Sequence, residues 1–496
     1  MSRCNVVVIG GSAAGLATAL LLSQDGHAVR LLEEERLPEC ATPLEAFELW
    51  ERRGSPQSRH SHAFLARLHN AIKNRVPRLY QDLMEAGADT LRFSDMAREV
   101  FDEAELIPED EEITLLACRR ITYDWVMRRY VERETDAVYE SGVQVRGLLA
   151  DRDPSTDLPR VRGVRVQRDD GSEEEIEADL VVDASGRNSS LREWLEEIGT
   201  EPFTQESESC GIFYCSRFYR LLDDAPTPAI DGPIGADLGY MKYAIFLGDS
   251  RIFSITLAAA PSDDALREVR RSEVFQAAAT ALPSTRAWVD PAVSAPITDV
   301  YTYANLKNTL RFFVRDGRPL ALGLYPVGDS LVHMNPISGR GCTAAWIGAE
   351  LLTSALRTHP GDPLAFALEL DAGVQRELVP WYQSMREQDR GARETSQLTS
   401  EGIDPFAFQR PDGTIDPKGY MRSILRDGLM PAMREDIVVL RAFMRVFNML
   451  DAPSDLLTKP ELMQRVLAVW QRREQREPMQ LGPPRAEMLR HLENAA

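Results

Sequence analysis

The N-terminal residues contain the pattern that most restricts how this chain can fold. Residues 4–9 are a short β-branched run, typical of a buried parallel strand, and they lead into a glycine-rich turn at residues 10–15. An apolar helical pattern follows as far as Asp25 and Gly26, and residues 28–32 are a second predicted strand. A strand, a glycine turn, a helix and a strand make a βαβ unit, so we expect an α/β fold built on a parallel sheet.

The turn itself has the composition of a dinucleotide-binding loop. It gathers free backbone N–H groups and the positive end of a helix dipole at one point, where a pyrophosphate can bind. Ser12 takes the place of the second glycine in G-x-G-x-x-G and is still small. Glu33 ends the second strand, where a carboxylate binds ribose hydroxyls. The alternative is a tight turn that only allows close helix packing, but the acid and the spacing favour an adenine-dinucleotide site.

A second glycine cluster lies far downstream, at residues 327–343, where another buried strand ends and another helix begins. Asp329 is placed to bind a ribityl hydroxyl, and Gly339 and Gly341 would let the backbone pass close to a flat ring. The helix beginning near Gly341 would direct its positive end at that ring, which suits an anionic reduced flavin. Asp329 could instead be an ordinary helix cap. Two such loops fit FAD, a cofactor long enough to reach both, better than NAD.

Three motifs in this order, the turn with Glu33, residues 183–189 and residues 328–341, resemble the group A flavoprotein monooxygenases, the superfamily of aromatic hydroxylases. The resemblance spans residues 4–370. Residues 56–62 and 117–120, followed by Asp124 and Trp125, are most similar to the branch that contains polyether epoxidases. The resemblance implies a Rossmann-like FAD-binding domain of the glutathione reductase type, a β-sheet substrate domain and a helical C-terminal region.

The resemblance also implies roles for individual residues. Pro336 would place its carbonyl near the flavin C4a atom, Arg120 would touch the cofactor, and Arg59 would lie in the loop over the flavin. The cofactor-binding set that follows is Gly10, Ser12, Ala13, Ala14, Gly15, Glu33, Arg59, Arg120, Gly328, Asp329, Gly339 and Gly341.

The sequence departs from the family pattern at three places. Ser185 stands where the family has an acid that contacts both FAD and NADPH. NADPH or NADH could therefore act directly or through a separate flavin reductase. Many relatives have a histidine three residues after the aspartate that corresponds to Asp329, but here Val332 occupies that position and His333 comes one residue later. Arg340 stands where glutamine or histidine is commoner.

The expected activity is insertion of one oxygen atom from O2 into a hydrophobic small molecule, by hydroxylation or epoxidation, through a flavin C4a-hydroperoxide. The tryptophan pair W-x-W of flavin halogenases is absent, which makes a halogenase the weaker alternative. A geranylgeranyl-reductase-like ene reductase or desaturase stays open, as does a flavin-binding protein without turnover.

The expected domains are discontinuous. Residues 1–88, 113–200 and 306–370 would form the FAD-binding domain, 89–112 and 201–305 the β-sheet substrate domain, and 371–496 the helical C-terminal region. Within them we expect one helix from about residue 63 to 87, short strands over 89–118, and a small antiparallel meander around 143–178.

Composition and charge restrict the expected partners and cellular location of the protein. A net charge of −20 without a basic run argues against nucleic acid as a partner. No stretch has the ~18 to 20 apolar residues of an integral membrane segment. Six scattered cysteines without a C-x-x-C pair favour a reduced, cytoplasmic setting and give no zinc motif. His60 and His62 lack accompanying ligands, so we expect them to be polar groups near the flavin, with no metal site.

Overall fold

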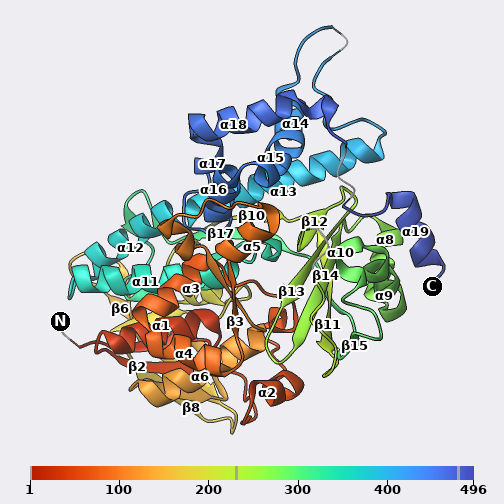
Figure 1. The fold of residues 1–496 in the computed structure, drawn as a ribbon. Coiled ribbons are helices and arrows are strands. Elements are labelled where there is room, and N and C mark those ends of the chain that lie inside the picture. Colours follow the sequence, from red (N-terminus) through yellow and green to blue (C-terminus); the bar gives the residue numbers. More distant parts are fainter. Residues whose placement is uncertain (1–2, 230–232, 411, 478–480, 496) are drawn as a thin grey trace.

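A five-stranded parallel sheet is the centre of the computed structural model, which describes residues 3–229, 233–410, 412–477 and 481–495 (Figure 1). Its strand order is β20-β9-β1-β2-β5. All four strand pairs are parallel. The predicted α/β fold with a Rossmann-like domain is thus confirmed, and the strands are β1 (Asn5–Ile9), β2 (Ala28–Glu33), β5 (Val138–Ser141), β9 (Leu180–Asp183) and β20 (Leu324–Pro326).

Alternate residues of β1 face two different layers, as the two-residue period of a strand requires. Val6 and Val8 pack against helices, whereas Val7 and Ile9 pack against the predicted antiparallel meander. The helices are α1 (Ala13–Gln24), α6 (Arg120–Glu134), α11 (Gly341–Thr358) and α12 (Pro363–Glu377). The meander is β6 (Val143–Arg152), β7 (Pro159–Arg168) and β8 (Glu173–Glu177), flanked by α7 (Leu191–Glu197). The central sheet is therefore buried on both faces.

A second sheet stands beside the first, on the right of Figure 1. Its antiparallel strands are β12 (Gly235–Asp237), β13 (Met241–Leu247), β14 (Ile252–Ala259), β11 (Phe213–Leu221), β15 (Ser294–Pro296) and β16 (Tyr301–Tyr303). Four short helices join it: α8 (Asp264–Arg267), α9 (Ser272–Ala281), α10 (Pro283–Arg286) and the C-terminal α19 (Arg485–Glu493). Met488 and Leu492 of α19 are buried in the core of this unit. The last helix of the chain therefore returns to the second sheet.

Smaller sheets connect these units. β10 (Thr204–Ser209), β17 (Lys307–Phe312) and β21 (Val332–His333) form one, and β3 (Asp89–Arg92) pairs with β4 (Thr114–Ala117). β18 (Val314–Arg315) and β19 (Arg318–Pro319) form a hairpin. After the second sheet, the chain forms β17 of this small sheet, then β20 of the parallel sheet, and then β21, which pairs with β17. This part of the chain therefore leads from the second sheet back to the first.

Two local predictions were wrong. The single helix expected over residues 63–87 is two, α3 (Ala66–Arg75) and α4 (Pro77–Glu85), because Pro77 cannot continue α3. The expected strands over 89–118 are interrupted by α5 (Phe93–Val100). Phe93 and Ala97 are four residues apart and both buried, so helical packing outweighs the apparent alternation there.

The C-terminal region is helical, as predicted, and covers the upper side of the molecule in Figure 1. It contains α13 (Val379–Ser400), α14 (Pro417–Ser423), a π-helical turn (Ile424–Leu429), α15 (Met430–Glu435), α16 (Ile437–Phe447), α17 (Asp455–Thr458) and α18 (Pro460–Gln471). Arg441 of α16 donates to both carboxylate oxygens of Asp110, at 2.6 and 3.0 Å. Among the described residues, no helix combines the length and apolar character that crossing a bilayer needs.

Candidate functional site

The glycines of the N-terminal turn have no room for side chains. Gly10 has φ +101°, and a Cβ there would lie 2.7 Å from the carbonyl oxygen of Ala184 in the loop after β9. A Cβ on Gly15 would overlap the carbonyl oxygen of Gly10. The N–H of Gly10 donates to the Leu32 carbonyl at 2.7 Å, which fixes the end of β1 against β2. The turn is thus held tightly from both sides.

The N-terminus of α1 is free of competing groups. Ser12 is its N-cap residue but makes no side-chain cap bond, and no acidic side chain lies in the first turn. The first N–H groups of a helix have no partner within the helix and carry the positive end of its dipole. These groups, beside a turn that excludes side chains, fit a pyrophosphate.

Glu33 lies beside the turn and is buried. Its Oε2 accepts a hydrogen bond from the N–H of Gly11 at 2.8 Å and one from Arg52 Nη2 at 3.1 Å. Arg52 Nε also donates to Glu35 at 3.0 Å, so one buried guanidinium neutralises two carboxylates at the end of β2. Sequence reasoning missed Arg52, because nothing in the sequence separates it from the neighbouring Arg53.

Arg120, at the start of α6, connects the two predicted cofactor loops. Its Nη2 donates to Ser12 Oγ at 3.0 Å and its Nη1 to Cys342 Sγ at 3.2 Å, while Nε pairs with Asp124 at 2.9 Å. Burial by itself would lower the pKa of Arg120, but Asp124, Cys342 and Tyr123 together raise it above its ordinary value. The structure therefore places a permanent positive charge between the N-terminal turn and the start of α11.

The downstream loop lies directly against the first. Gly328 has φ +59°, and a Cβ there would lie 2.7 Å from the Cβ of Ala14. Ser330 Oγ accepts from the N–H of Gly186 at 2.8 Å, which attaches the middle motif to the same place. Ser185, in the position of the family's acid, donates its hydroxyl to buried Asp183 at 2.6 Å. Burial raises the pKa of Asp183, although its hydrogen bonds oppose that rise.

The segment from Pro336 to Gly341 is positioned from α13. Asn335 Nδ2 donates to Asp389 Oδ1 at 2.8 Å, and Asn308 Nδ2 donates to Asp389 Oδ2 at 2.6 Å. The side-chain oxygen of Asn335 accepts from the Ile337 N–H at 3.2 Å and caps the turn at Pro336. Gly341 has open space around it, since a Cβ there would meet no heavy atom of the described residues within 4 Å. Asp389 and Asn308 were not predicted, because only tertiary packing brings them to the loop.

The guanidinium of Arg59 is bound to backbone carbonyls near the end of α2 (Pro43–Leu49). Its Nη1 donates to the carbonyl of Phe47 and its Nη2 to that of Trp50 at 2.7 Å, and its guanidinium lies over the Phe47 ring. Arg59 therefore holds the end of α2 under the segment of residues 56–62.

His60 is buried at the head of a chain of hydroxyl groups. Thr256 donates to Ser61 and Ser61 to Ser254, both at 2.8 Å, and Ser216 lies 2.8 Å from Thr256 and 3.2 Å from His60 Nδ1. Each hydroxyl has one proton, so Ser216 donates to Thr256 and Nδ1 of His60 carries the proton given to Ser216. Burial lowers the pKa of His60 to about 3, which keeps the ring neutral.

His62 belongs to the Arg120 network instead. Its Nδ1 is 3.0 Å from the His60 carbonyl, and its Nε2 is 3.3 Å from Arg120 Nη1 and accepts that proton. Burial, helped by the nearby Arg120 charge, lowers the pKa of His62 to about 3. Within the described ranges, no cluster of three His, Cys, Asp or Glu side chains is arranged to hold a metal ion.

A cavity of about 3920 Å³ runs along these groups. Its wall includes nine of the thirteen predicted site residues: Ser12, Ala13, Ala14, Arg120, Gly328, Asp329, Pro336, Gly339 and Gly341. Gly10, Gly15 and Glu33 shape the turn behind that wall. A typical pocket for one small ligand measures roughly 300–1,000 Å³, so this cavity has room for more than a cofactor.

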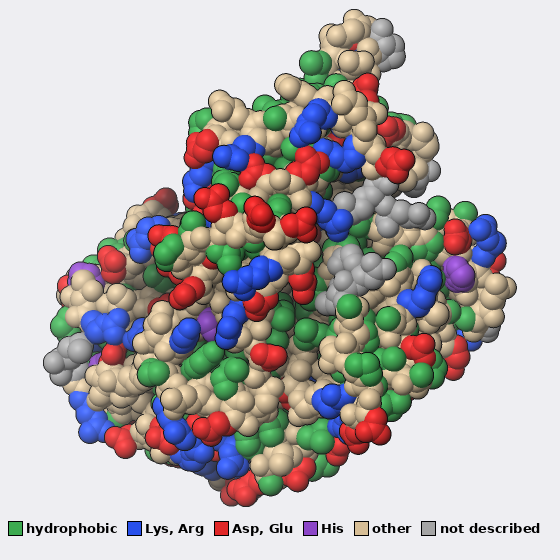
Figure 2. Space-filling view, viewed as in Figure 1, with side chains coloured by type: hydrophobic (Ala, Val, Ile, Leu, Met, Phe, Trp, Pro, Cys, Tyr) green, Lys and Arg blue, Asp and Glu red, His purple; other side chains and the backbone are tan. Residues whose placement is uncertain are grey.

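The far side of the cavity is largely apolar. The second sheet contributes side chains such as Ile212, Tyr214, Met241, Ile245 and Tyr303, and the C-terminal helices add Met433, Phe443 and Phe447. On the face of the molecule shown in Figure 2, by contrast, acidic and basic side chains are interspersed. The cavity thus joins a region lined by the two glycine-rich loops to an apolar region.

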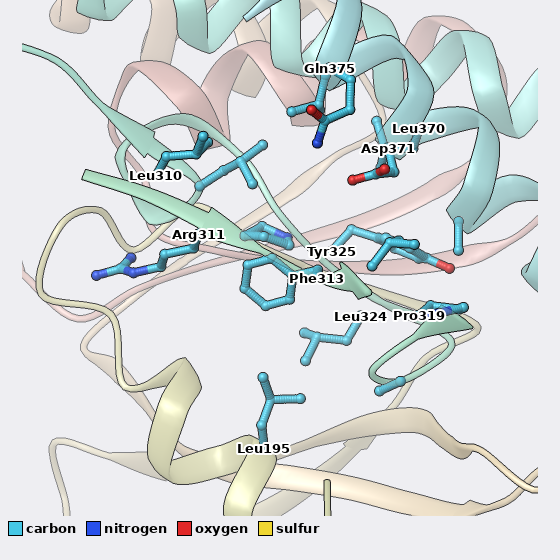
Figure 3. A pocket seen from close by; sticks show the side chains of 16 residues that line it. Leu195, Leu310, Arg311, Phe313, Pro319, Leu324, Tyr325, Leu370, Asp371 and Gln375 are labelled. Atoms are coloured by element: carbon cyan, nitrogen blue, oxygen red, sulfur yellow. The ribbon is translucent and has the colours of Figure 1, made fainter. Parts of the chain in front are cut away.

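A second cavity lies between α7 and α12, lined by Leu195, Phe313, Asp371 and Gln375 among others (Figure 3). Its volume is about 40 Å³, enough for a few water molecules and too small for an organic substrate.

Protein Rv3254 of Mycobacterium tuberculosis is 26% identical over 506 residues, covering 96% of this chain and 97% of that protein. The fold is similar to OxyS anhydrotetracycline hydroxylase from Streptomyces rimosus, with a TM-score of 0.56, 18% identity and coverage of 91% and 77% of the two chains. It is equally similar to the myxobacterial chondrochloren halogenase CndH, with a TM-score of 0.56, 16% identity and coverage of 100% and 97%.

The family described as FAD dependent oxidoreductase (DAO) matches residues 5–355. This range begins with β1 and ends within α11, so it contains both loops that line the cofactor end of the cavity. The chain therefore belongs to the family of FAD-dependent oxidoreductases.

Proposed function

We propose that this enzyme is a monooxygenase that transfers one oxygen atom from O2 to a hydrophobic small molecule. The observation that supports this most is the continuity of one cavity from the first turn of α1 to the apolar face of the second sheet. FAD, when bound, supplies the redox chemistry. The protein's part is to position both molecules and to keep water from the reacting atoms.

In this proposal, Ser12, Ala13 and Ala14 hold the pyrophosphate with their N–H groups, and Gly10 and Gly15 give the turn its shape. Glu33 binds the adenosine end and Asp329 the ribityl end. Gly328, Gly339 and Gly341 allow close approach of the backbone, Arg120 joins the two loops, and the carbonyl of Pro336 faces the reacting part of the ring. Arg59 acts through the segment of residues 56–62 that it supports. Residues 201–305 contribute the substrate wall.

The electrons that reduce FAD could come from a separate flavin reductase or directly from NADPH or NADH. Ser185 directs its hydroxyl at Asp183, so the place of the family's NADPH-contacting acid presents no carboxylate. We infer that a separate flavin reductase delivers the electrons, and we treat direct reduction by NADPH or NADH as the rival. Oxidation of each nucleotide in air, with and without an added flavin reductase, separates the two.

A halogenase is the second candidate, because the CndH fold matches the whole of this chain. The decisive experiment gives the reduced, FAD-loaded enzyme 18O2 together with hydrophobic aromatics and alkenes, with and without bromide. Incorporation of one 18O atom supports the monooxygenase, and epoxides from alkenes would favour the epoxidase branch. A brominated product supports the halogenase. Saturation or desaturation of the substrate without oxygen would overturn both in favour of a reductase or desaturase.

A further inference from the structure

Arg340 differs from the other buried arginines. Four arginine side chains are buried in the described part of the chain, namely those of Arg52, Arg119, Arg120 and Arg340. The first three form salt bridges, with Glu33 and Glu35, with Asp249, and with Asp124 respectively. Among the described residues, no carboxylate lies within salt-bridge distance of Arg340, which is only 5% exposed. Burying a cation without a counter-ion is costly, so its retention calls for a reason.

The contacts of Arg340 leave part of its guanidinium free. Nη1 donates to the thioether sulfur of Met385 at 3.2 Å, and the guanidinium lies 4.7 Å from the centre of the Trp381 ring. Nε is buried and has no hydrogen-bond partner in the described structure. A thioether is a weak acceptor. The Nε and Nη2 edge therefore has no protein acceptor to satisfy it.

The nearest acid does not fill this gap. Asp389 raises the pKa of Arg340, but both oxygens of Asp389 accept hydrogen bonds from the amides of Asn335 and Asn308. Burial is the larger effect and lowers the pKa of Arg340 to about 10. The guanidinium is therefore still positively charged at neutral pH.

Arg340 stands at the wall of the large cavity, where its Nε is itself enclosed. Arg340 lines the large cavity between Pro336 and α13. It is also the N-cap residue of α11, whose first turn contains no acidic side chain. The positive end of an 18-residue helix adds to the charge of the guanidinium there.

We propose that Arg340 binds the carboxylate of an acidic substrate, so that the substrate class is a hydrophobic carboxylic acid. The guanidinium is charged and lacks a carboxylate partner, and its N–H groups can donate to both oxygens of a carboxylate, which a spherical halide does not offer. This inference rests on the proposed function, since it takes the molecule at the apolar end of the cavity to be the substrate.

The test measures binding of anions to the FAD-loaded enzyme by flavin difference spectra. The ligands are phenylacetate, cinnamate and decanoate, each beside its primary amide, and sodium bromide. We expect saturable spectra with the carboxylates and at least tenfold weaker binding of the amides. In Arg340→Gln the carboxylate Kd should rise by about 10- to 150-fold, the value of a hydrogen bond to a charged group. Arg340→Lys should keep part of the affinity, because the charge remains and the fork is lost.

Arg422→Gln is the matched control. Arg422 lines the same cavity but pairs with Glu394 at 3.0 Å, so its replacement should leave the carboxylate Kd unchanged. Arg340→Met should not lower the thermal midpoint, because removing an unpaired buried cation relieves its desolvation cost. Arg340→Lys serves as the test protein should the glutamine variant fail to fold.

Three outcomes would overturn the inference. Saturable binding of bromide but not of carboxylates would make Arg340 a halide site. An unchanged carboxylate Kd in Arg340→Gln would remove Arg340 from the ligand site. A shifted flavin midpoint potential in that variant, with carboxylate binding intact, would assign its charge to the cofactor. Carboxylate binding without any 18O incorporation would refute the proposed function and leave this site standing.

Discussion

Gly15 and Gly341 lie in the first turns of the two helices at the cofactor end, but their surroundings differ. Gly15→Ala would force a Cβ onto the carbonyl of Gly10, so we expect no FAD in the purified protein. Gly341→Ala meets open space, and alanine is the better helix former by up to about 1 kcal/mol. The FAD-free Gly341→Ala protein should thus be at least as stable as wild type, while its new methyl group weakens FAD binding. Flavin content and thermal midpoints check both, and a flavin-loaded Gly15→Ala protein would contradict the turn geometry.

Arg52 should matter for stability more than its loop position suggests. Arg52→Met leaves the Glu33 carboxylate buried without its cation, and we expect the free energy of unfolding to fall by about 3 to 5 kcal/mol. The neighbouring Arg53 is exposed, so Arg53→Met should change it by less than ~0.5 kcal/mol. Urea unfolding of the two variants at pH 7 gives the comparison. Equal midpoints would show that the buried pair contributes nothing.

His60 gives the fold a defined acid sensitivity. Its pKa is about 3 when folded and ~6.5 when unfolded, so the unfolded chain binds the extra proton in between. This contribution to stability is complete above pH ~6.5 and is lost as the pH falls towards 3, by up to about 1.4 kcal/mol per pH unit. As the pH is lowered from 7 to 6 and 5, the urea midpoint of unfolding should fall less steeply in His60→Gln than in the wild type. Exposed His491→Gln is the control, and parallel profiles for wild type and His60→Gln would be evidence against the buried neutral ring.

The sequence predicted residues whose role depends on local pattern. Gly10, Ser12, Gly15 and Glu33 follow from strand, turn and helix spacing, and the structure brings them together. The sequence could not predict Asp389, which lies on α13 and contacts the downstream loop through Asn335 and Asn308. Arg340 was visible only as a departure from a family pattern. Its unpaired state depends on burial, which no local spacing records.

At the level of elements, the buried ion pair of Arg441 and Asp110 links α16 to the N-terminal half of the chain, beside the more exposed pair of Arg445 and Glu112. Arg441→Ala leaves Asp110 without its bidentate partner, and we expect α16 to open more easily by about 3 kcal/mol. Arg465→Ala removes a more exposed pair with Asp436 and should cost under ~1 kcal/mol. Amide hydrogen exchange in α16 distinguishes the two. Unchanged exchange in Arg441→Ala would mean that the other contacts of α16 are enough to hold the helix.

Elements with a strong local signal were the most predictable. β1, α1 and β2 and the meander follow from periodicity and glycine positions, as does α11. The region of α5 was not predictable in this way. Eight residues are too few for a period to stand out, and Phe93 and Ala97 are fixed by packing against Ile113 and Leu440, far away in the sequence.

Taken as a whole, the molecule surrounds its cavity with three parts of the chain, the parallel sheet unit, the second sheet and the C-terminal helices (Figure 1). A ligand that bridges both cofactor loops should stabilise them together. FAD at 100 times its Kd is expected to add about 2.7 kcal/mol and to raise the thermal midpoint. ADP and FMN, which each reach one loop, should raise it less at the same concentration. A rise with ADP equal to that with FAD would mean that the downstream loop adds nothing to binding.

The pairing of β1 with the distant strand β9 has a consequence for how the protein is made. During synthesis the first βαβ unit leaves the ribosome long before β9 and β20, so β1 has an unpaired edge until β9 arrives, and β9 has one until β20 arrives. Pairing across such sequence distances is slow, and exposed strand edges promote aggregation. The nascent chain therefore has to be kept from association until α11 is complete, and expression yield should depend on chaperone supply more than on the stability of the finished protein.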